Sequence, residues 1–391
     1  MSDPRDVVVV SAVRTAVGKA NKGSFKDTRP DDLLIAALKG ALERVPELDA
    51  ADIGDVIVGT AMPEAEQGMN VARIGALGAG IPETVPAMTI NRFCSSGLQS
   101  LAQGAAAIKA GYYDVALTGG VESMTQIAMG GGRPTPNPGL METHPELYSP
   151  MGITSENVAR RFEVTREQQD AFAASSHQKA AAAISGGKFK DEIVPVATRV
   201  FNGGEWHDVT VDTDEGVRAD TTAEGLARLR PVFHVKGTTT AGNASQMSDG
   251  AAATVIMSRE KAEELGLAIL GVLRSYAVVG VPPDIMGIGP AKAIPAALKR
   301  AGIEVDAVDV FEINEAFASQ AVYCVRELGI DVDKVNVNGG AIALGHPLGC
   351  TGAKLTATLL YEMKRRDSRY GVVSMCIGGG MGAAAVFERE G

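Results

Sequence analysis

The sequence has few of the residues that mark several large classes of protein. Aromatic residues make up 5% of the 391 residues, tryptophan occurs once, and cysteine occurs four times. No two cysteines form a C-x-x-C pair, which argues against a zinc site, and four cysteines are too few to form a disulfide framework in so long a chain. No apolar run approaches the roughly 20 residues that a membrane-spanning helix needs. We therefore expect no metal centre, no disulfide framework and no membrane span.

Basic residues are also in the minority. The 37 lysines and arginines are outnumbered by 47 aspartates and glutamates, and the net charge is −10. This balance argues against a nucleic-acid partner, since contacts with phosphates need a basic face. Residues 1–6 are charged rather than apolar, and residues 387–391 carry no peroxisomal targeting tripeptide. We therefore expect a protein of the reducing cytoplasm.

Small apolar residues in a regular alternation are what the sequence does contain. Hydrophobic residues make up 45% of the chain and 46 residues are glycine, which allows two or three core-forming units with closely packed helices. Predicted strands alternate with predicted helices, an α/β pattern that favours a mostly parallel sheet. Strands are expected at residues 7–12, 55–60, 85–90, 114–119, 251–257, 268–279, 308–313, 335–337, 371–377 and 383–387, and helices at residues 30–45, 71–80, 98–110, 290–300, 316–328 and 351–364.

The alternation is interrupted in the middle of the chain. Residues 130–150 are rich in proline and glycine and have no periodicity, which predicts a loop. Two helices are expected next, and Thr165 and Gln168 form a capping box at the start of the second. A polar, strand-like stretch with the single tryptophan follows. These elements are predicted at residues 154–162, 165–184 and 193–214, and we interpret the region as an insertion laid over the α/β core.

The two halves that flank this insertion share an outline. Each has a strand, a glycine-rich turn and a small-residue helix, and each carries one reactive side chain, Cys94 in the first half and His346 in the second. We infer a duplicated α/β unit in which two helix N-termini meet at a common site. The predicted units are an N-terminal α/β half of residues 1–120 and 249–270, an inserted loop domain of residues 121–248, and a C-terminal α/β half of residues 271–391.

Cys94 lies in the stretch NRFCSSGLQS, residues 91–100, where a predicted strand gives way to a helix. Unpaired backbone N–H groups and the positive end of the helix dipole favour a thiolate there, and the thiolate is the nucleophilic form. The pattern predicts a nucleophile with a depressed pKa. The alternative is a packing role, because a buried cysteine more often behaves as a small hydrophobe.

His346 lies between two glycines and directly before Pro347, on a turn that a ligand can reach. Histidine is the side chain most easily tuned as a general base near neutral pH. The stretch does not fit a phosphate-binding loop, because His346 stands where the lysine of such a loop would be. The remaining histidines lie in polar or irregular contexts and are expected at the surface: His144, His177, His207 and His234.

Two further stretches near the C-terminus have chemical potential. Cys376 ends a buried strand and is followed by four glycines within six residues, whose bare N–H groups are suited to stabilising an oxyanion. The alternative for this stretch is a glycine-rich turn between paired strands. Residues 312–317 put polar groups at the end of an apolar strand, where α/β sheets bind their ligands. Cys324 and Cys350 are expected to be packing residues.

Six segments of the chain, in this order, resemble the signature segments of thiolases. The resemblance runs from about residue 7 to residue 387. It implies the thiolase fold, in which two duplicated βαβ-type halves form a five-layered α-β-α-β-α core with an inserted loop domain. The segments are NRFCSSGLQ (91–99), GGVESM (119–124), TAGNASQMSDG (240–250), NEAF (314–317), GHPLGCTG (345–352) and CIGGGMG (376–382).

The resemblance also implies a division of catalytic labour. Cys94 would accept the acyl group as a thioester, and His346 would remove its proton and help polarise the thioester carbonyl. Cys376 would exchange a proton with the α-carbon of acetyl-CoA. Asn314 would hold a water that completes one oxyanion hole with His346, and the N–H groups of Cys94 and Gly378 would form the other. Acyl transfer through a covalent intermediate needs this set of a nucleophile, a base and two oxyanion sites.

Coenzyme A contacts are implied in and beside the inserted segment. By the same resemblance, Arg218, Phe233 and Ser245 would bind coenzyme A, with Met151 near the pantetheine. Phe317 is a further predicted coenzyme A residue. A single cation at Arg218 is enough to meet the nucleotide phosphates although the chain as a whole is acidic. Coenzyme A and acyl-CoA would be substrates, with no permanently bound cofactor.

Details within the motifs resemble the degradative branch of the family. The segment SPMGITSEN, residues 149–157, is similar to that of degradative 3-ketoacyl-CoA thiolases, whereas biosynthetic enzymes often have histidine where Pro150 stands. Arg92, Phe93 and Ser95 favour the same branch. The implied activity is that of an acetyl-CoA C-acyltransferase of fatty-acid beta-oxidation, working as a homodimer with a tetramer possible. Residues 270–290 resemble peroxisomal thiolases, but the absence of their presequence favours a bacterial cytoplasm.

Three alternatives remain open at the level of sequence. The nearest is a biosynthetic acetoacetyl-CoA thiolase that condenses two acetyl-CoA. A decarboxylating ketoacyl synthase fits less well, since such enzymes pair one cysteine with two histidines or with histidine and asparagine. An acyl-CoA-binding protein without catalysis is disfavoured because Cys94, His346 and Cys376 are all present.

Overall fold

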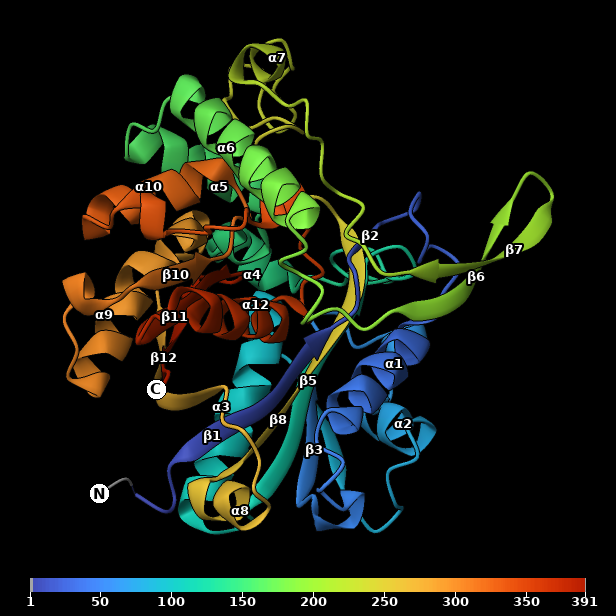
Figure 1. Cartoon of the computed structure of the whole chain (residues 1–391). Helices are drawn as coiled ribbons and strands as arrows, with labels where there is room; N and C mark the ends of the chain where they lie inside the picture. Colours follow the sequence, from blue (N-terminus) through green and yellow to red (C-terminus); the bar gives the residue numbers. More distant parts are fainter. Residues whose placement is uncertain (1–2, 391) are drawn as a thin grey trace.

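The computed structural model describes residues 3–390 and contains a ten-stranded mixed sheet within them. Nine strands follow the order β10-β11-β12-β9-β1-β8-β5-β3-β4, and the short β2 pairs with β8 (Figure 1). The first half supplies β1 (Val7–Arg14), β2 (Gly18–Lys19), β3 (Asp55–Gly59), β4 (Ala87–Ile90), β5 (Val115–Ser123) and β8 (Ser248–Ser258). The second half supplies β9 (Gly271–Gly280), β10 (Val310–Ile313), β11 (Tyr370–Ile377) and β12 (Met381–Glu388).

Both faces of each half of the sheet are covered by helices. On β1, Val7 and Val9 join the apolar cluster formed with the central helices, while Val8 joins the cluster formed with the outer helices. This alternation follows from the two-residue period of a strand. The outer helices of the first half are α1 (Pro30–Glu43) and α2 (Val71–Gly78), and α8 (Arg259–Glu264) follows β8. The central pair is α3 (Ser96–Ala110) and α12 (Thr351–Arg366).

The second half repeats the arrangement. On β12, Ala383 and Ala385 face the central cluster, and Ala384 faces the outer cluster with α9 (Gly289–Ala301). The helices α10 (Ala318–Leu328) and α11 (Ala341–Leu344) complete this half. The five-layered α-β-α-β-α core is therefore present, with α3 and α12 as its central layer.

Glycines allow the two central helices to touch backbone to backbone. A Cβ atom on Gly352 of α12 would come within 2.3 Å of the backbone nitrogen of Leu98 on α3. A Cβ atom on Gly97 would come within 2.8 Å of the backbone nitrogen of Ala353. Contacts this close exclude any side chain, so the N-terminal ends of α3 and α12 meet, as predicted. Cys94 precedes one of these ends and His346 precedes the other.

The prediction of a mostly parallel sheet is wrong. Only β3–β4, β3–β5 and β10–β11 are parallel among the strands described, whereas β5–β8, β1–β8, β1–β9, β9–β12 and β11–β12 are antiparallel. The long insertion returns the chain to β8 in the reverse direction. A tight turn with Gly379 and Gly380 at positive φ joins β11 directly to β12. Alternation of strand and helix does not reveal either reversal.

The strand predicted at residues 335–337 is also absent from the described structure. Val335 makes a single bridge with Phe311, and Asn336 has a φ of +44°, which ends extended backbone. The Asn336 amide instead accepts from the Ile313 N–H and donates to the Ile313 carbonyl, both at 2.8 Å. A side chain thus substitutes for a strand pairing at the end of β10.

The insertion forms a separate layer of helices with a projecting hairpin. Its helices are α4 (Pro138–Thr143), α5 (Met151–Arg161), α6 (Arg166–Ser185) and α7 (Ala223–Ala227), and its strands are β6 (Val196–Asn202) and β7 (Glu205–Val211). The predicted capping box is present at Thr165 and Gln168. The expected loop at 130–150 contains the short helix α4. In Figure 1 these green elements lie across one end of the core, and the β6–β7 hairpin extends away from it.

Within residues 3–390, no helix is both long enough and apolar enough to cross a bilayer. The division into three units at residues 120, 248 and 270 stays a prediction.

Candidate active site

Cys94 sits in a sharp turn between β4 and α3. The turn is a single 3-10 segment, Phe93–Ser95, and Phe93 has a φ of +44°, a left-handed conformation that costs a non-glycine residue about 1–3 kcal/mol. Side chains on either side hold it: Asn91 accepts from the Phe93 N–H at 2.8 Å, and Ser96 donates to the Phe93 carbonyl at 2.7 Å. The strain is compensated locally, and the cysteine is held at the helix entrance.

The surroundings of the Cys94 sulfur correct the expected direction of its pKa. Burial raises the pKa of the Cys94 thiol to about 11, although the N–H groups of Gly378 and of Cys94 itself point at the sulfur and oppose the shift. The prediction of a depressed pKa considered only the helix end and left out desolvation, which is the larger effect here. The resting sulfur is therefore a thiol and requires a base in order to attack.

His346 is held in one orientation by backbone and side-chain contacts. Its backbone N–H donates to the Gln246 carbonyl at 3.1 Å and to the Ser248 hydroxyl at 3.2 Å. Gly345 before it has a φ of +97°, and a Cβ atom there would lie 2.3 Å from the Ser248 oxygen. Glycine is therefore required at this position, and it brings the imidazole into the protein interior, where it is 3% exposed.

Thr351 determines which ring nitrogen of His346 carries the proton. The Thr351 hydroxyl donates to the Pro347 carbonyl at 2.9 Å, so it must accept from Nδ1–H of His346, 2.6 Å away. Nε2 is then unprotonated, and the Asn314 amide donates to it at 3.3 Å. Burial, with a smaller effect from Lys354, lowers the pKa of His346 to about 3, so the ring is neutral at physiological pH. A neutral imidazole with a free Nε2 lone pair is a general base.

Two buried carboxylates support this arrangement. Glu122 accepts from the N–H groups of Ala61 at 2.7 Å and Gly349 at 2.8 Å, so it ties the histidine loop to the segment that follows β3. Glu315 accepts from the Ser176 hydroxyl at 2.7 Å and from the Ile342 N–H of α11 at 3.1 Å. Removing one partner of such a group costs about 1–3 kcal/mol. Both carboxylates therefore have structural roles in positioning the loops.

Asn314 follows β10 directly. Its backbone N–H donates to the Ser374 carbonyl at 2.9 Å and so prolongs the β10–β11 pairing by one residue. Its side-chain oxygen is buried and has no hydrogen-bond partner among residues 3–390. A free acceptor next to Nε2 of His346 is suited to hold a small hydroxylic molecule.

Cys376 and Gly378 also lie close to the Cys94 sulfur. Cys376 is fully buried near the end of β11, in a cluster with Met286, Phe317 and Met151. Burial raises the pKa of Cys376 well above its usual value, and the neighbouring Cys94 adds to the shift. A Cβ atom on Gly378 would lie 3.6 Å from the Met151 sulfur and 3.9 Å from the Phe93 ring. The glycine after β11 therefore closes the space between Cys94 and the insertion.

Four of the five predicted coenzyme A residues gather on this side. Phe233 and Phe317 stack edge to face with ring centroids 6.3 Å apart, and the Ser245 N–H donates to the Ala316 carbonyl at 3.0 Å. Met151 packs against the apolar cluster that contains Phe317.

Arg218, the fifth predicted coenzyme A residue, is exposed. Its backbone N–H donates to Nδ1 of His177 at 3.1 Å. His177 was expected at the surface, but it is buried on the inner side of α6, where burial and Arg218 lower its pKa to about 4. The polar sequence around His177 does not reveal this burial, because a later part of the insertion packs against α6 only in the folded chain.

Sequence reasoning missed Thr351, Glu122 and Glu315 as parts of the site. Each lies within one of the motifs. Thr351 had a local signal, because it is the first residue of the helix that follows GHPLG. The carboxylates have no such signal, because their partners are backbone groups far away in the sequence. Cys324 and Cys350 are buried, as the packing prediction required.

Two protein-family models match consecutive parts of the chain. Residues 7–260 match the thiolase N-terminal domain and residues 267–389 match the thiolase C-terminal domain. The chain belongs to the thiolase family. It is 59% identical to the 3-ketoacyl-CoA thiolase of Bacillus subtilis, over 98% of this chain and 99% of that protein. It is also 59% identical to the mouse peroxisomal 3-ketoacyl-CoA thiolase B, over 99% of this chain and 91% of that one.

Solved thiolase structures share the whole fold. The dimeric peroxisomal thiolase of Saccharomyces cerevisiae superposes with a TM-score of 0.91 at 46% identity, over 100% of this chain and 99% of that chain. Human mitochondrial 3-ketoacyl-CoA thiolase superposes with a TM-score of 0.90 at 39% identity, covering 100% of both chains. The thiolase fold predicted from the motifs is confirmed.

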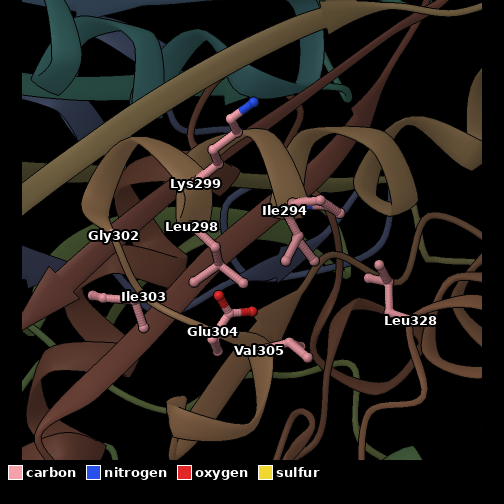
Figure 2. Close-up of a pocket in the computed structure, with 9 residues that line it drawn as sticks. Ile294, Leu298, Lys299, Gly302, Ile303, Glu304, Val305 and Leu328 are labelled. Carbon is pink, nitrogen blue, oxygen red and sulfur yellow. The ribbon is translucent and has the colours of Figure 1, made fainter.

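Metal ligands and a cavity away from Cys94 are the other features of the described residues to compare with this site. Among residues 3–390, no group of three or more His, Cys, Asp or Glu side chains is placed to hold a metal ion. A cavity of about 380 Å³ lies beside α9 and is lined by Ile294, Leu298, Ile303 and Val305, with Lys299 pointing outward (Figure 2). These aliphatic residues belong to the outer core cluster or pack against it. The cavity is therefore a gap at the rim of that core.

Proposed function

We propose that this thiolase cleaves 3-ketoacyl-CoA with coenzyme A, giving acetyl-CoA and an acyl-CoA shortened by two carbons, in fatty-acid beta-oxidation. One observation carries the proposal: the buried Cys94 thiol faces the Gly378 N–H and a second thiol, Cys376, across a site whose histidine is neutral. Names of relatives at 59% identity over nearly the full chain support the same substrate class.

In the first half-reaction, Nε2 of His346 takes the proton of Cys94 while the sulfur attacks the 3-keto carbon. The oxyanion that forms at C3 is stabilised by the N–H groups of Cys94 and Gly378, and the charge that develops on the thioester carbonyl of the departing acetyl-CoA is stabilised by His346 and the water proposed at Asn314. When the bond between C2 and C3 breaks, its electron pair passes to C2, and Cys376 donates its proton there. Acetyl-CoA leaves, the shortened acyl group stays on Cys94 as a thioester, and Cys376 is left as a thiolate.

The second half-reaction restores the resting state. The thiol of coenzyme A gives its proton to the Cys376 thiolate and attacks the thioester carbon on Cys94. The N–H groups of Cys94 and Gly378 stabilise the oxyanion, a role supported by their contact with the Cys94 sulfur. Collapse releases the new acyl-CoA, and the Cys94 sulfur recovers its proton from His346. Protons and electron pairs therefore balance over the two half-reactions.

Coenzyme A would extend from this site past the apolar cluster toward solvent. Met151 and Phe317 are suited to the pantetheine because they pack beside Cys376, and Phe233 stacks on Phe317. Ser245 follows Ala244, which also contacts this cluster. The exposed Arg218 guanidinium would meet the phosphates, and neither a metal nor a permanent cofactor is needed.

A ladder of 3-ketoacyl-CoA chain lengths tests the proposal. We expect thiolysis of each substrate, with kcat/KM higher for substrates longer than acetoacetyl-CoA, because the degradative motif at residues 149–157 begins α5 beside Cys376. The products are measured by mass spectrometry. Turnover confined to acetoacetyl-CoA would favour the biosynthetic alternative, and binding without turnover would favour an acyl-CoA-binding protein.

We also propose that the chain forms a homodimer through its first half. The edge strand β4 ends the sheet there, its residues are half-buried, and the similar yeast structure is described as dimeric. An unpaired sheet edge is a site where a second strand can pair. Sedimentation at micromolar concentration should give twice 40.5 kDa. Four times that mass would indicate a tetramer, and monomer alone would contradict the proposal. The cytoplasmic location stays a prediction.

A further inference from the structure

A polar side chain from outside the motifs lies beside Cys376. The Cys376 sulfur lies 3.1 Å from one end of the amide of Gln320, a fully buried residue in the first turn of α10. The other residues that pack with Cys376 are Met286, Ala316, Phe317, Met151 and Ala244. A buried amide that contacts a reactive sulfur in such apolar surroundings indicates a specific role for that amide.

The partners of the Gln320 amide determine which end faces the sulfur. That end lies 3.1 Å from the backbone carbonyl of Asn314, which can only accept a hydrogen bond, so it is the NH2 group. The other end lies 2.7 Å from the Ala321 N–H, which can only donate, so it is the oxygen. The NH2 group has two hydrogens, one for the Asn314 carbonyl and one directed at Cys376.

Packing leaves this amide little freedom to turn away. A Cβ atom on Gly287 would lie 2.7 Å from the Gln320 Cβ, so the 3-10 segment Pro283–Ile288 presses on the base of the side chain. The amide therefore links Asn314 and Cys376, two residues that take part in the proposed mechanism.

We propose that Gln320 is a positioning residue that donates a hydrogen bond to Cys376 and stabilises the thiolate formed when this cysteine gives its proton to the α-carbon. The inference rests on the proposed thiolysis. An N–H donor favours the charged form of a buried acid, whereas desolvation disfavours it. Without the donor, the thiolate would lie in an apolar cluster beside the Cys94 sulfur, with its own backbone N–H as the stabilising group. Gln320 thus offsets part of the cost of burying Cys376.

The test replaces Gln320 with methionine, which keeps the length of the side chain and removes the donor. A hydrogen bond to a charged group is worth about 1.5–3 kcal/mol, so exchange of acetyl-CoA α-protons in deuterated water should slow about 10- to 100-fold at neutral pH. The removal of an α-proton needs the Cys376 thiolate, so the pH profile of exchange should move to higher pH by at least about one unit. Loading of Cys94 from an acyl-CoA donor should slow less than exchange, because Cys94 and His346 are unchanged and coenzyme A can leave as a thiolate without a proton from Cys376.

Ser319→Ala is the matched control. Ser319 is the neighbouring buried residue of α10, and its hydroxyl contacts Ser155 at 2.7 Å rather than Cys376. This variant should keep the wild-type pH profile. If Gln320→Met does not fold, Gln320→Leu is measured by the same criteria, since it also removes the donor and suits the apolar surroundings.

The outcomes separate this inference from the proposed function. If wild-type protein neither exchanges α-protons nor performs thiolysis, the proposed function is wrong. If wild type is active and the Gln320 variant keeps its rate and pH profile, the role of Gln320 is overturned. An equal loss of exchange and of Cys94 loading would also overturn it, because that result would show a purely structural residue.

Discussion

Cys94→Ser is expected to lose the covalent acyl intermediate and to slow thiolysis by about four orders of magnitude or more, the scale seen when a catalytic nucleophile is removed. The serine hydroxyl has nearly the same shape, but its pKa is so much higher that His346 is too weak a base to remove its proton. Burial already raises the pKa of the thiol at this position to about 11, so a still weaker acid such as serine would not be deprotonated there.

The measurement is peptide mass mapping after incubation with a 3-ketoacyl-CoA in the absence of free coenzyme A. Wild-type protein should carry the acyl group on Cys94. Cys324→Ser and Cys350→Ser are matched controls, because burial raises the pKa of each of these thiols to about 12. Neither has His346 or the Gly378 N–H recorded beside it. An acyl group found on Cys324 or Cys350 would show that the nucleophile is misassigned.

Cys376→Ser is expected to slow α-proton exchange of acetyl-CoA and thiolysis by roughly two or more orders of magnitude, the usual scale for losing a general acid–base. Burial raises the pKa of the Cys376 thiol above the ~8.5 of a free thiol, but a serine hydroxyl in the same place is a far weaker acid and cannot give and retake the proton. Cys94 stays intact in this variant, so it should still accept an acyl group from an acyl-CoA donor.

Exchange in deuterated water is compared between Cys376→Ser, Cys94→Ser and Cys324→Ser. The last variant changes a buried thiol of α10 whose sulfur donates to the Gly287 carbonyl at 3.4 Å, and it should exchange at the wild-type rate. If Cys376→Ser also exchanged at that rate, Cys376 would be a structural cysteine, and another group would have to protonate the acetyl-CoA carbanion.

Most elements could be predicted because their signals are local. The capping box at Thr165 and Gln168 depends on residues three apart, and it is present in the structure. The hydrophobic strands and small-residue helices of both halves lie close to where the pattern placed them, except for the strand expected at residues 335–337. Strand direction has no such local signal, because β8 pairs antiparallel with β1 and β5 only after the insertion has brought the chain back. The sheet was therefore predicted with the wrong balance of parallel and antiparallel pairs.

The reactive residues were visible in the same local way. Cys94, His346 and Cys376 each stand among glycines at the end of a strand or the start of a helix, and motif order identified the family. Their supporting residues were not visible. Glu122 holds the Gly349 N–H from 227 positions away, and Gln320 reaches Cys376 across 56 positions. Such partners are adjacent only after the two halves have packed together.

The sequence by itself determined the family, the α/β class and the residues that carry the chemistry, because these depend on residue type, order and short-range spacing. Tertiary structure alone decided the protonation of the site. Local backbone dipoles predicted a low pKa for Cys94, yet burial raises it, lowers that of His346, and through Thr351 determines which nitrogen of His346 is free. Desolvation depends on everything packed around a group, and no stretch of sequence contains that information.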